Sequence, residues 1–448
     1  MRTARWAAVL SVAIISAGCV AAAPSVAPGV GATRPPTATR PAGATPTPPR
    51  AVATPPAVTG PDAWLAVARK GAAGIQVIRA GTAELMFDLP LGAPTDARWS
   101  HLVTTIHDGD RTIVRTVTVP AGAAPARELT VDGAWRLPTF EGDAVPVGLS
   151  TDGSTIVLVA DTPTPNQTRL AVFQAPFDQA PRFVTVPGTF TYDAVSPDGR
   201  TIYVIEHLAA PPSGHYQVRA IDVASGKMKP DVIVDKLKIG EQMAGWPVDQ
   251  LRRTDGSVLT VYRGGEHPFI HALYSADGYA QCIDLPSATG DGTDAALDWG
   301  IAPAASGGSV FAVNATLGLV VEVNAPDAKI VRTAHLKPLL SAAVTLAKFG
   351  HEDGGPVGRR IVVSPDGATL YAAGKGGIVA VGTRRLDETG RFLAGQAVDA
   401  LGLTPDGTIL YALTAGTGRI ARLDASDGRL LGYVPGDGYA ALLAVVPW

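Results

Sequence analysis

The stretch that decides the fold is Ser196-Pro197-Asp198-Gly199, followed at once by the apolar run Thr201-Ile202-Tyr203-Val204-Ile205. The same pairing of turn and run recurs at 364–373 and at 404–413. Glycine tolerates a positive φ and aspartate hydrogen-bonds its own backbone, so Asp-Gly between two apolar runs predicts a tight hairpin turn. Each copy is therefore expected to join two antiparallel strands.

Weaker copies of the turn extend this pattern along the chain. They centre on Asp152, Asp255 and Ser306, and together with the clear copies they recur at intervals of about 40 to 60 residues. A hairpin repeated at such a period predicts four-stranded blades arranged as a β-propeller. The expected fold class is all-β, with a single propeller rather than several domains.

The two ends of the repeat complete each other. Residues 62–65 begin at a turn with no innermost strand before them, whereas residues 441–447 copy an innermost strand and stop. We expect the C-terminal strand to complete the first blade and close the ring, which leaves no exposed sheet edge. Counting separate early units at 64–88 and 102–131 gives eight blades, and merging those two units would give seven.

The first 18 residues have the features of a signal peptide. Arg2 and Arg5 precede an apolar stretch at 7–15 that is too short to span a bilayer as a helix. The following Ser16-Ala17-Gly18-Cys19 resembles the lipobox of bacterial lipoproteins, although Ser16 stands where that family usually carries leucine. The resemblance implies a diacylated Cys19 as the new N-terminus. Ordinary cleavage near residues 21–23 is the alternative.

Residues 19–61 have the composition of a stalk. They are rich in Pro, Ala and Thr and contain no acidic residue, which predicts disorder with polyproline II character. Such a stalk would hold residues 62–448 roughly 35 Å from the anchor if flexible and up to about 130 Å if extended. Because two acyl chains give stable attachment, the expected location is the cell envelope, lipid-anchored to a membrane outside the cytoplasm.

Composition and motifs narrow the function classes. The formal net charge of -3 gives no electrostatic reason to expect a nucleic-acid partner. The sequence contains no Gly-x-Ser-x-Gly, no His-Glu-x-x-His, no phosphate-binding Gly-x-x-x-x-Gly-Lys and no Cys-x-x-Cys-His. We therefore predict no cofactor, with a divalent metal ion as the alternative.

Polar residues gather in two sets of loops that should share one face of the propeller, namely those after the second strands and those that lead into the next blade. The candidate ligand or metal residues there are His107, Asp108, Glu206, His207, His215, Glu266, His267 and His351. Imidazole and carboxylate groups from neighbouring blades could hold a divalent ion or polarise a carbonyl group. The alternative is that polar residues collect in loops in any case. Asp298 is expected in a solvated acidic loop.

Short strand segments resemble a known repeat. Ile202-Tyr203-Val204 and Phe311-Ala312-Val313-Asn314 are similar to the core of the YVTN-type propeller repeat, and the Ser-Pro-Asp-Gly turns look like those of YVTN-type and TolB-type repeats. The resemblance covers about 62–448 and implies the fold. It leaves the activity open, because related propellers include surface-layer proteins, lactonases and quinoprotein or haem enzymes.

The function that this reasoning favours is a membrane-anchored extracytoplasmic module that binds a protein or a cell-envelope ligand through its loop face. The absence of catalytic motifs and the presence of a tether both support binding over turnover. The alternative is a lactonase-like or other metal-assisted hydrolase that uses the histidines and carboxylates of the same loops. No catalytic residue is assigned from the sequence.

Overall fold

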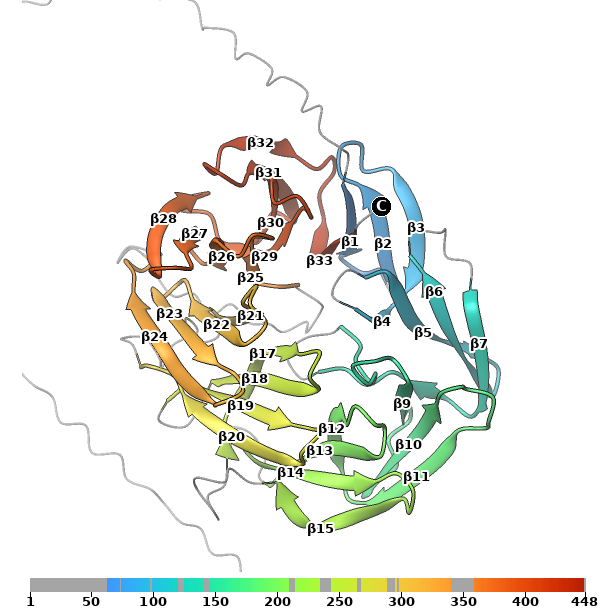
Figure 1. Ribbon diagram of the computed structural model, residues 1–448. Helices are drawn as coiled ribbons and strands as arrows, with labels where there is room; N and C mark the ends of the chain where they lie inside the picture. The colour runs from blue at the N-terminus through green and yellow to red at the C-terminus, as the bar shows by residue number, and fades with distance from the viewer. Residues whose placement is uncertain are drawn as a thin grey trace, which may run out of the picture. The chain divides into compact units, whose positions relative to one another are not determined.

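The chain forms an all-β propeller of eight blades (Figure 1). This computed structural model describes residues 63–72, 74–96, 99–119, 125–140, 145–208, 214–233, 243–263, 267–287, 295, 298–339 and 358–446. All of them lie within the unit Pro55–Trp448. The described residues begin at 63, so the expected signal peptide, Cys19 and the expected stalk fall outside them. Across the described ranges, no helix is long and apolar enough to cross a membrane.

Blades are numbered in chain order, with the strands of each given from the channel outward. Blade 1 contains β33 (Tyr439–Val446), β1 (Trp64–Arg69), β2 (Gly74–Arg79) and β3 (Leu85–Pro90). Blade 2 contains β4 (Gly92–Pro94), β5 (His101–Asp108), β6 (Arg111–Thr118) and β7 (Pro125–Asp132). Blade 3 contains β8 (Trp135–Arg136), β9 (Thr155–Ala160), β10 (Gln167–Gln174) and β11 (Arg182–Pro187). Blade 4 contains β12 (Phe190–Val195), β13 (Thr201–His207), β14 (His215–Asp222) and β15 (Lys227–Ile233), with β16 (Met243–Ala244) also paired to β14.

The second half of the ring follows the same order. Blade 5 contains β17 (Trp246–Arg252), β18 (Ser257–Arg263), β19 (Phe269–Tyr274) and β20 (Tyr279–Asp284). Blade 6 contains β21 (Trp299–Pro303), β22 (Ser309–Asn314), β23 (Leu319–Asn324) and β24 (Lys329–His335). Blade 7 contains β25 (Ile361–Val363), β26 (Thr369–Gly374), β27 (Gly377–Gly382) and β28 (Asp387–Phe392). Blade 8 contains β29 (Val398–Leu403), β30 (Ile409–Thr414), β31 (Arg419–Asp424) and β32 (Leu430–Tyr433).

Ring closure joins the N-terminal and C-terminal strands in blade 1. β33 pairs antiparallel with β1, from Trp64 opposite Val446 to Arg69 opposite Tyr439. This confirms that the C-terminal strand completes the first blade. The count is eight and not seven, because β1–β3 and β5–β7 belong to separate sheets.

The direction of the strands defines two faces of the propeller. The turn face is the end where first strands turn into second strands, as at 196–199, and the mouth face is the opposite end, where second strands lead into third strands. In blade 1, β1 is the second strand and starts at Trp64, opposite Val446 of the first strand. The first and last described residues of the propeller therefore lie on the turn face.

The recurring turn is held by hydrogen bonds from its own side chains. Ser196 Oγ donates to Asp198 Oδ1 at 2.6 Å and accepts from the Thr201 backbone N–H at 2.9 Å. The backbone N–H of Arg200 donates to the same oxygen of Asp198 at 3.0 Å. These hydrogen bonds hold the pKa of Asp198 below its ordinary value. Equivalent bonds form around Asp152, Asp366 and Asp406.

Tyrosines of the repeat core tie two of the blades to the next one along the chain. Tyr203 in β13 donates its hydroxyl to the backbone carbonyl of Ser275 in blade 5, at 2.7 Å. Tyr371 in β26 does the same to Ala425 in blade 8, at 2.8 Å. Apolar side chains fill the space between blades: Leu259, Trp299 and Val321 pack together between blades 5 and 6 and are fully buried. The core is therefore divided among the blade interfaces.

Blade 3 departs from the regular pattern near the channel. β8 pairs with β9 only through Trp135 and Arg136, and the chain rejoins β9 later through an isolated bridge from Leu149 to Ile156. The segment between these two contacts replaces most of a regular innermost strand, which the sequence pattern did not predict.

Candidate functional site

The described candidate residues lie at the mouth ends of their strands. His107 and Asp108 end β5, Glu206 and His207 end β13, His215 begins β14, and His267 precedes β19. These positions belong to blades 2, 4 and 5. The candidates Glu266 and His351, like Cys19, lie outside the described residues.

His107 reaches across from blade 2 to blade 3. Its Nε2 lies 3.7 Å from Asp161 Oδ2, and Arg136 Nε lies 3.5 Å from the other oxygen of the same carboxylate. The His107 and Asp161 side chains are 47% and 43% exposed, so solvent screens this contact and its contribution to stability is small. The group is accessible to a ligand on the mouth face.

The Glu206–His207 pair does not act as one unit. Glu206 accepts hydrogen bonds from Gln217 Nε2 at 2.6 Å and from Arg219 at 3.1 Å, both on the neighbouring strand β14. His207 Nε2 instead lies 3.2 Å from Thr191 Oγ1 on β12. Successive side chains of a strand point to opposite sides of the sheet, so the carboxylate and the imidazole have different surroundings.

The remaining histidines are held separately. His267 Nδ1 lies 2.6 Å from Ser287 Oγ in blade 5. The Nδ1 of His215 is buried and has no hydrogen-bond partner among the residues that the structure describes. Within the described ranges, no three His, Cys, Asp or Glu side chains come close enough together to hold a metal ion. A metal site built from the candidate set would need ligands from the segments beyond those ranges.

Two exposed apolar side chains accompany these histidines on the mouth face. Leu208 is 38% exposed and Trp246 is 37% exposed. The backbone N–H of Leu208 donates to the carbonyl of His215, which pairs with Ala244 only two residues before Trp246. Leu208, His215 and Trp246 therefore lie along one short path across blades 4 and 5, and we call them the rim patch.

A buried carboxyl group in the innermost strand of blade 4 was missed by sequence reasoning. Asp193 is 7% exposed, and burial raises its pKa to about 6 although Arg252 lowers it. Arg252 donates to the backbone carbonyl of Asp193 at 2.6 Å, and Gln250 Nε2 lies 3.4 Å from the carboxylate. Both come from the innermost strand of blade 5, so this aspartate joins two blades.

Innermost-strand aspartates of the next two blades make similar connections. Asp249 of blade 5 accepts from the Ile301 backbone N–H of blade 6 at 2.8 Å. Asp298, just before β21, accepts from Arg360 of blade 7 at 2.5 Å. The expectation of a solvated loop was wrong for Asp298, because its side chain is 3% exposed and paired. An aspartate five to eight residues before the turn centres Asp198, Asp255 and Ser306 of three consecutive repeats was the available signal.

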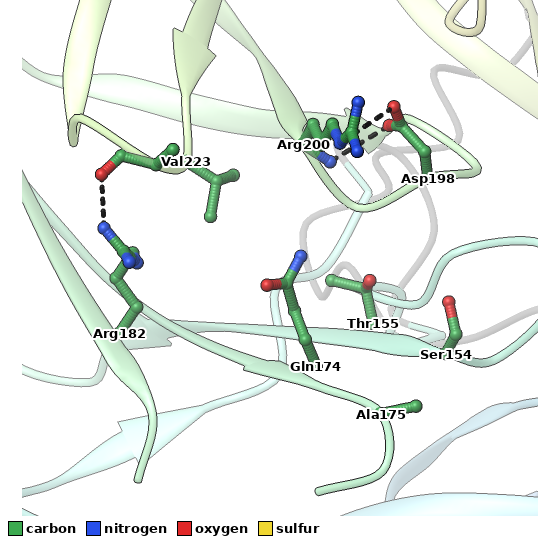
Figure 2. A pocket seen from close by; sticks show the side chains of 9 residues that line it. Ser154, Thr155, Gln174, Ala175, Arg182, Asp198, Arg200 and Val223 are labelled. Carbon is green, nitrogen blue, oxygen red and sulfur yellow. Dashed lines mark hydrogen bonds and ion pairs between the residues drawn. The ribbon is translucent and has the colours of Figure 1, made fainter. Parts of the chain in front are cut away.

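A pocket on the turn face lies far along the strands from the candidate histidines. It has a volume of about 400 Å³ between blades 3 and 4. Figure 2 shows side chains that line it, which come from the hairpin turns of both blades. The lining residues are Ser154, Thr155, Gln174, Ala175, Arg182, Asp198, Arg200, Val223 and Ala224. Sequence reasoning placed no site on this face.

No family model matches the chain, and no curated protein matches it. Among solved structures, apo AztD from Citrobacter koseri is 13% identical, with 84% of this chain and 97% of that chain covered and a TM-score of 0.49. The dihydro-heme d1 dehydrogenase NirN in complex with DHE is 14% identical, covering 87% and 76%, with a TM-score of 0.49. A putative 6-phosphogluconolactonase from Bacteroides fragilis is 16% identical, covering 77% and 98%, with a TM-score of 0.40. The similarity is distant and concerns the propeller fold alone.

Proposed function

We propose that the protein is an extracytoplasmic binding module, tethered by a lipid on Cys19, whose mouth face contacts a protein or cell-envelope partner. The observation that carries this proposal is the position of Trp64, which starts β1 on the turn face opposite Val446. A stalk that joins the propeller there leaves the opposite face clear of the tether. The mouth face is thus the surface best placed to meet a partner.

The rim patch supplies the chemistry for such contact. Aromatic side chains dominate the energetic centre of protein interfaces, and Trp246 offers a partly exposed indole on the same edge as the exposed Leu208. Tryptophan and histidine can also contact the apolar and polar faces of a sugar ring. The patch therefore suits a protein or a cell-wall polymer, and it requires no catalytic group.

Cross-linking of the intact lipidated protein in its own membrane tests the binding surface. We expect the double substitution Leu208→Ser, Trp246→Gln to abolish a cross-linked species that the wild type forms. Leu430→Ser is the matched control, because Leu430 is 43% exposed but lies on the outermost strand of blade 8. If the double variant and the control retain the species equally, while their melting temperatures match that of the wild type, the rim patch is not the partner surface.

The lipid anchor is tested separately. We expect Cys19→Ala to remove incorporation of a fatty-acid analogue and to release the protein from the membrane fraction, because Cys19 is the only residue that the lipobox-like sequence offers for acylation. Equal labelling of the wild type and the variant would contradict the anchor and would leave the binding proposal to be judged on the cross-linking result.

The metal-assisted hydrolase is the second candidate, favoured by the accessible His107–Asp161 contact on the mouth face. It would need Glu266 or His351 to complete a set of metal ligands, since the described residues contain no group of three ligands that could hold a metal ion. Elemental analysis of the purified full chain discriminates the two functions. Stoichiometric metal that is lost in the His107→Ala variant would favour the enzyme.

A further inference from the structure

The turn-face pocket between blades 3 and 4 contains polar groups that the fold does not use. We propose that it binds a small hydroxylated oxyanion, such as a sugar acid or a sugar phosphate (Figure 2). Its volume of about 400 Å³ is in the range of small-molecule pockets. It opens on the face opposite the rim patch, so this proposal stands independently of the proposed partner.

Thr155 lines the pocket with a hydroxyl group that the fold does not require. Its side chain is almost completely buried, at 1% exposed, and its hydroxyl makes no hydrogen bond within the described part of the chain. Ile409 occupies the same place in the turn of blade 8. Its backbone N–H donates to Thr404 Oγ1, just as the backbone N–H of Thr155 donates to Ser150 Oγ. An apolar side chain therefore satisfies the fold at this position, and the hydroxyl of Thr155 is left available to a ligand.

Two arginines give the pocket its cationic character. Arg200 follows Gly199 at a place where the other clear turns carry a small neutral residue, Ala368 or Thr408, and its side chain is 82% exposed. Arg182 donates to the backbone carbonyl of Ala224, which holds its guanidinium at the pocket wall. A guanidinium matches the planar oxygens of a carboxylate or phosphate with paired N–H donors.

The other polar groups set the ligand class. One oxygen of Asp198 accepts hydrogen bonds from the Ser196 hydroxyl and the Arg200 backbone N–H, and the other oxygen lies 3.8 Å from Arg200 Nε. Among the lining residues, two guanidiniums face one carboxylate, and Asp222, which neighbours the lining residue Val223, interacts with both Arg182 and Lys229. The cationic groups around the pocket therefore still outnumber these carboxylates, which favours an anion. Gln174 Nε2 donates to the Gly199 carbonyl at 2.9 Å, so its amide oxygen can accept a hydrogen bond from a ligand hydroxyl.

Close packing fixes the shape of the pocket. Gly199 has φ +68°, and a Cβ at this position would lie 2.1 Å from Thr155 Oγ1 and 2.8 Å from Gln174 Nε2. Only glycine allows the blade 4 turn to sit this close to the two blade 3 side chains. Thr155 and Gln174 are thus preorganised, which reduces the entropy lost on binding.

Calorimetric titration of the full chain at neutral pH tests the proposal with glucuronate, glucose 1-phosphate and glucose. We expect at least one anion to bind and glucose not to bind. Thr155→Val and Arg200→Gln should each lower the affinity for the anion by at least about tenfold, which is the usual effect of losing one hydrogen bond to a charged group. Thr369→Val, at the same turn position in blade 7, should bind as the wild type does.

Each arm of the experiment has a decisive outcome. Binding of glucuronate alone identifies the ligand class as a sugar acid, and binding of glucose 1-phosphate alone identifies it as a sugar phosphate. Failure of both anions to bind, equal binding of glucose, or full affinity in both Thr155→Val and Arg200→Gln would overturn the proposal. A melting temperature of Thr155→Val no lower than that of the wild type shows that lost affinity is not lost folding.

Discussion

Asp193 has an ionisable carboxyl group in a place where water hardly reaches it. Aspartate in an unfolded chain has a pKa of about 3.9, and burial raises the pKa of Asp193 to about 6 in the folded chain. The folded state therefore holds the proton more tightly than the unfolded state. The stability that this group contributes is fully present below about pH 4 and is lost as the pH rises through about 6.

Asp193→Asn should therefore stabilise the protein at alkaline pH. A pKa difference of about 2 units corresponds to about 3 kcal/mol, which is the upper limit for the gain in free energy of unfolding at pH 8. At pH 4 the gain should nearly vanish, because the wild-type carboxyl group is then neutral. Urea unfolding at the two pH values measures the difference.

Asp198→Asn is the control with the opposite sign. Hydrogen bonds from Ser196 and the Arg200 backbone lower the pKa of Asp198, so this carboxylate contributes stability above its unfolded pKa that is lost as the pH falls. The variant should be less stable than the wild type at pH 8. If Asp193→Asn instead loses stability equally at both pH values, the carboxyl group has a binding partner that its geometry does not reveal.

At the scale of the element, the tyrosine of the repeat core has a role beyond strand formation. The apolar run Ile202-Tyr203-Val204 predicts a strand correctly, and β13 contains it. The sequence could not show that the hydroxyl of Tyr203 crosses to the Ser275 carbonyl in the next blade, because its partner is a backbone group 72 residues away. Local pattern specifies strands and turns, whereas blade-to-blade contacts depend on the assembled ring.

Tyr371→Phe should lower the free energy of unfolding by about 1 kcal/mol, because it leaves the Ala425 carbonyl without its hydroxyl donor. Tyr203→Phe should have a similar effect, and the double variant should show the sum, since the two bonds share no partner. Thermal or urea unfolding measures each variant.

Tyr433→Phe is the matched control for these tyrosines. Tyr433 lies in β32 on the outside of blade 8, and its hydroxyl makes no hydrogen bond within the described residues, though the Arg419 guanidinium lies 3.7 Å from its ring centroid. Phenylalanine keeps that ring contact, so the change should be close to zero. A loss in the control as large as that in Tyr371→Phe would show that the hydroxyls act through solvation rather than through the blade contacts.

At the scale of the whole molecule, the ends of the repeat could be predicted and the site could not. Residues 62–65 and 441–447 carried complementary halves of one blade pattern, and the pairing of β1 with β33 confirms the prediction. Glu206 and His207 are adjacent in sequence and were expected on one loop, but they end strand β13, and strand geometry directs them to different neighbours. Residue type and spacing place side chains on a face, and only the packed structure decides which of them meet.

Closure makes the C-terminal strand essential to the entire ring. Removing residues 439–448 takes away β33, including the fully buried Ala441, which packs between blades 1 and 2, and Leu442, which packs between blades 1 and 8. It also leaves the inner edge of β1 with unpaired backbone groups. We expect a loss greater than about 5 kcal/mol, comparable with the whole stability of many domains.

Deletion of residues 24–58 is the comparison that gives this loss its meaning. Those residues have a composition that favours solvated chain over a packed core, so their removal should leave the melting temperature nearly unchanged. Thermal unfolding of both truncations, followed by circular dichroism, separates ring closure from mere shortening of the chain. Similar shifts in the two truncations would mean that the β1–β33 pairing does not hold the ring together.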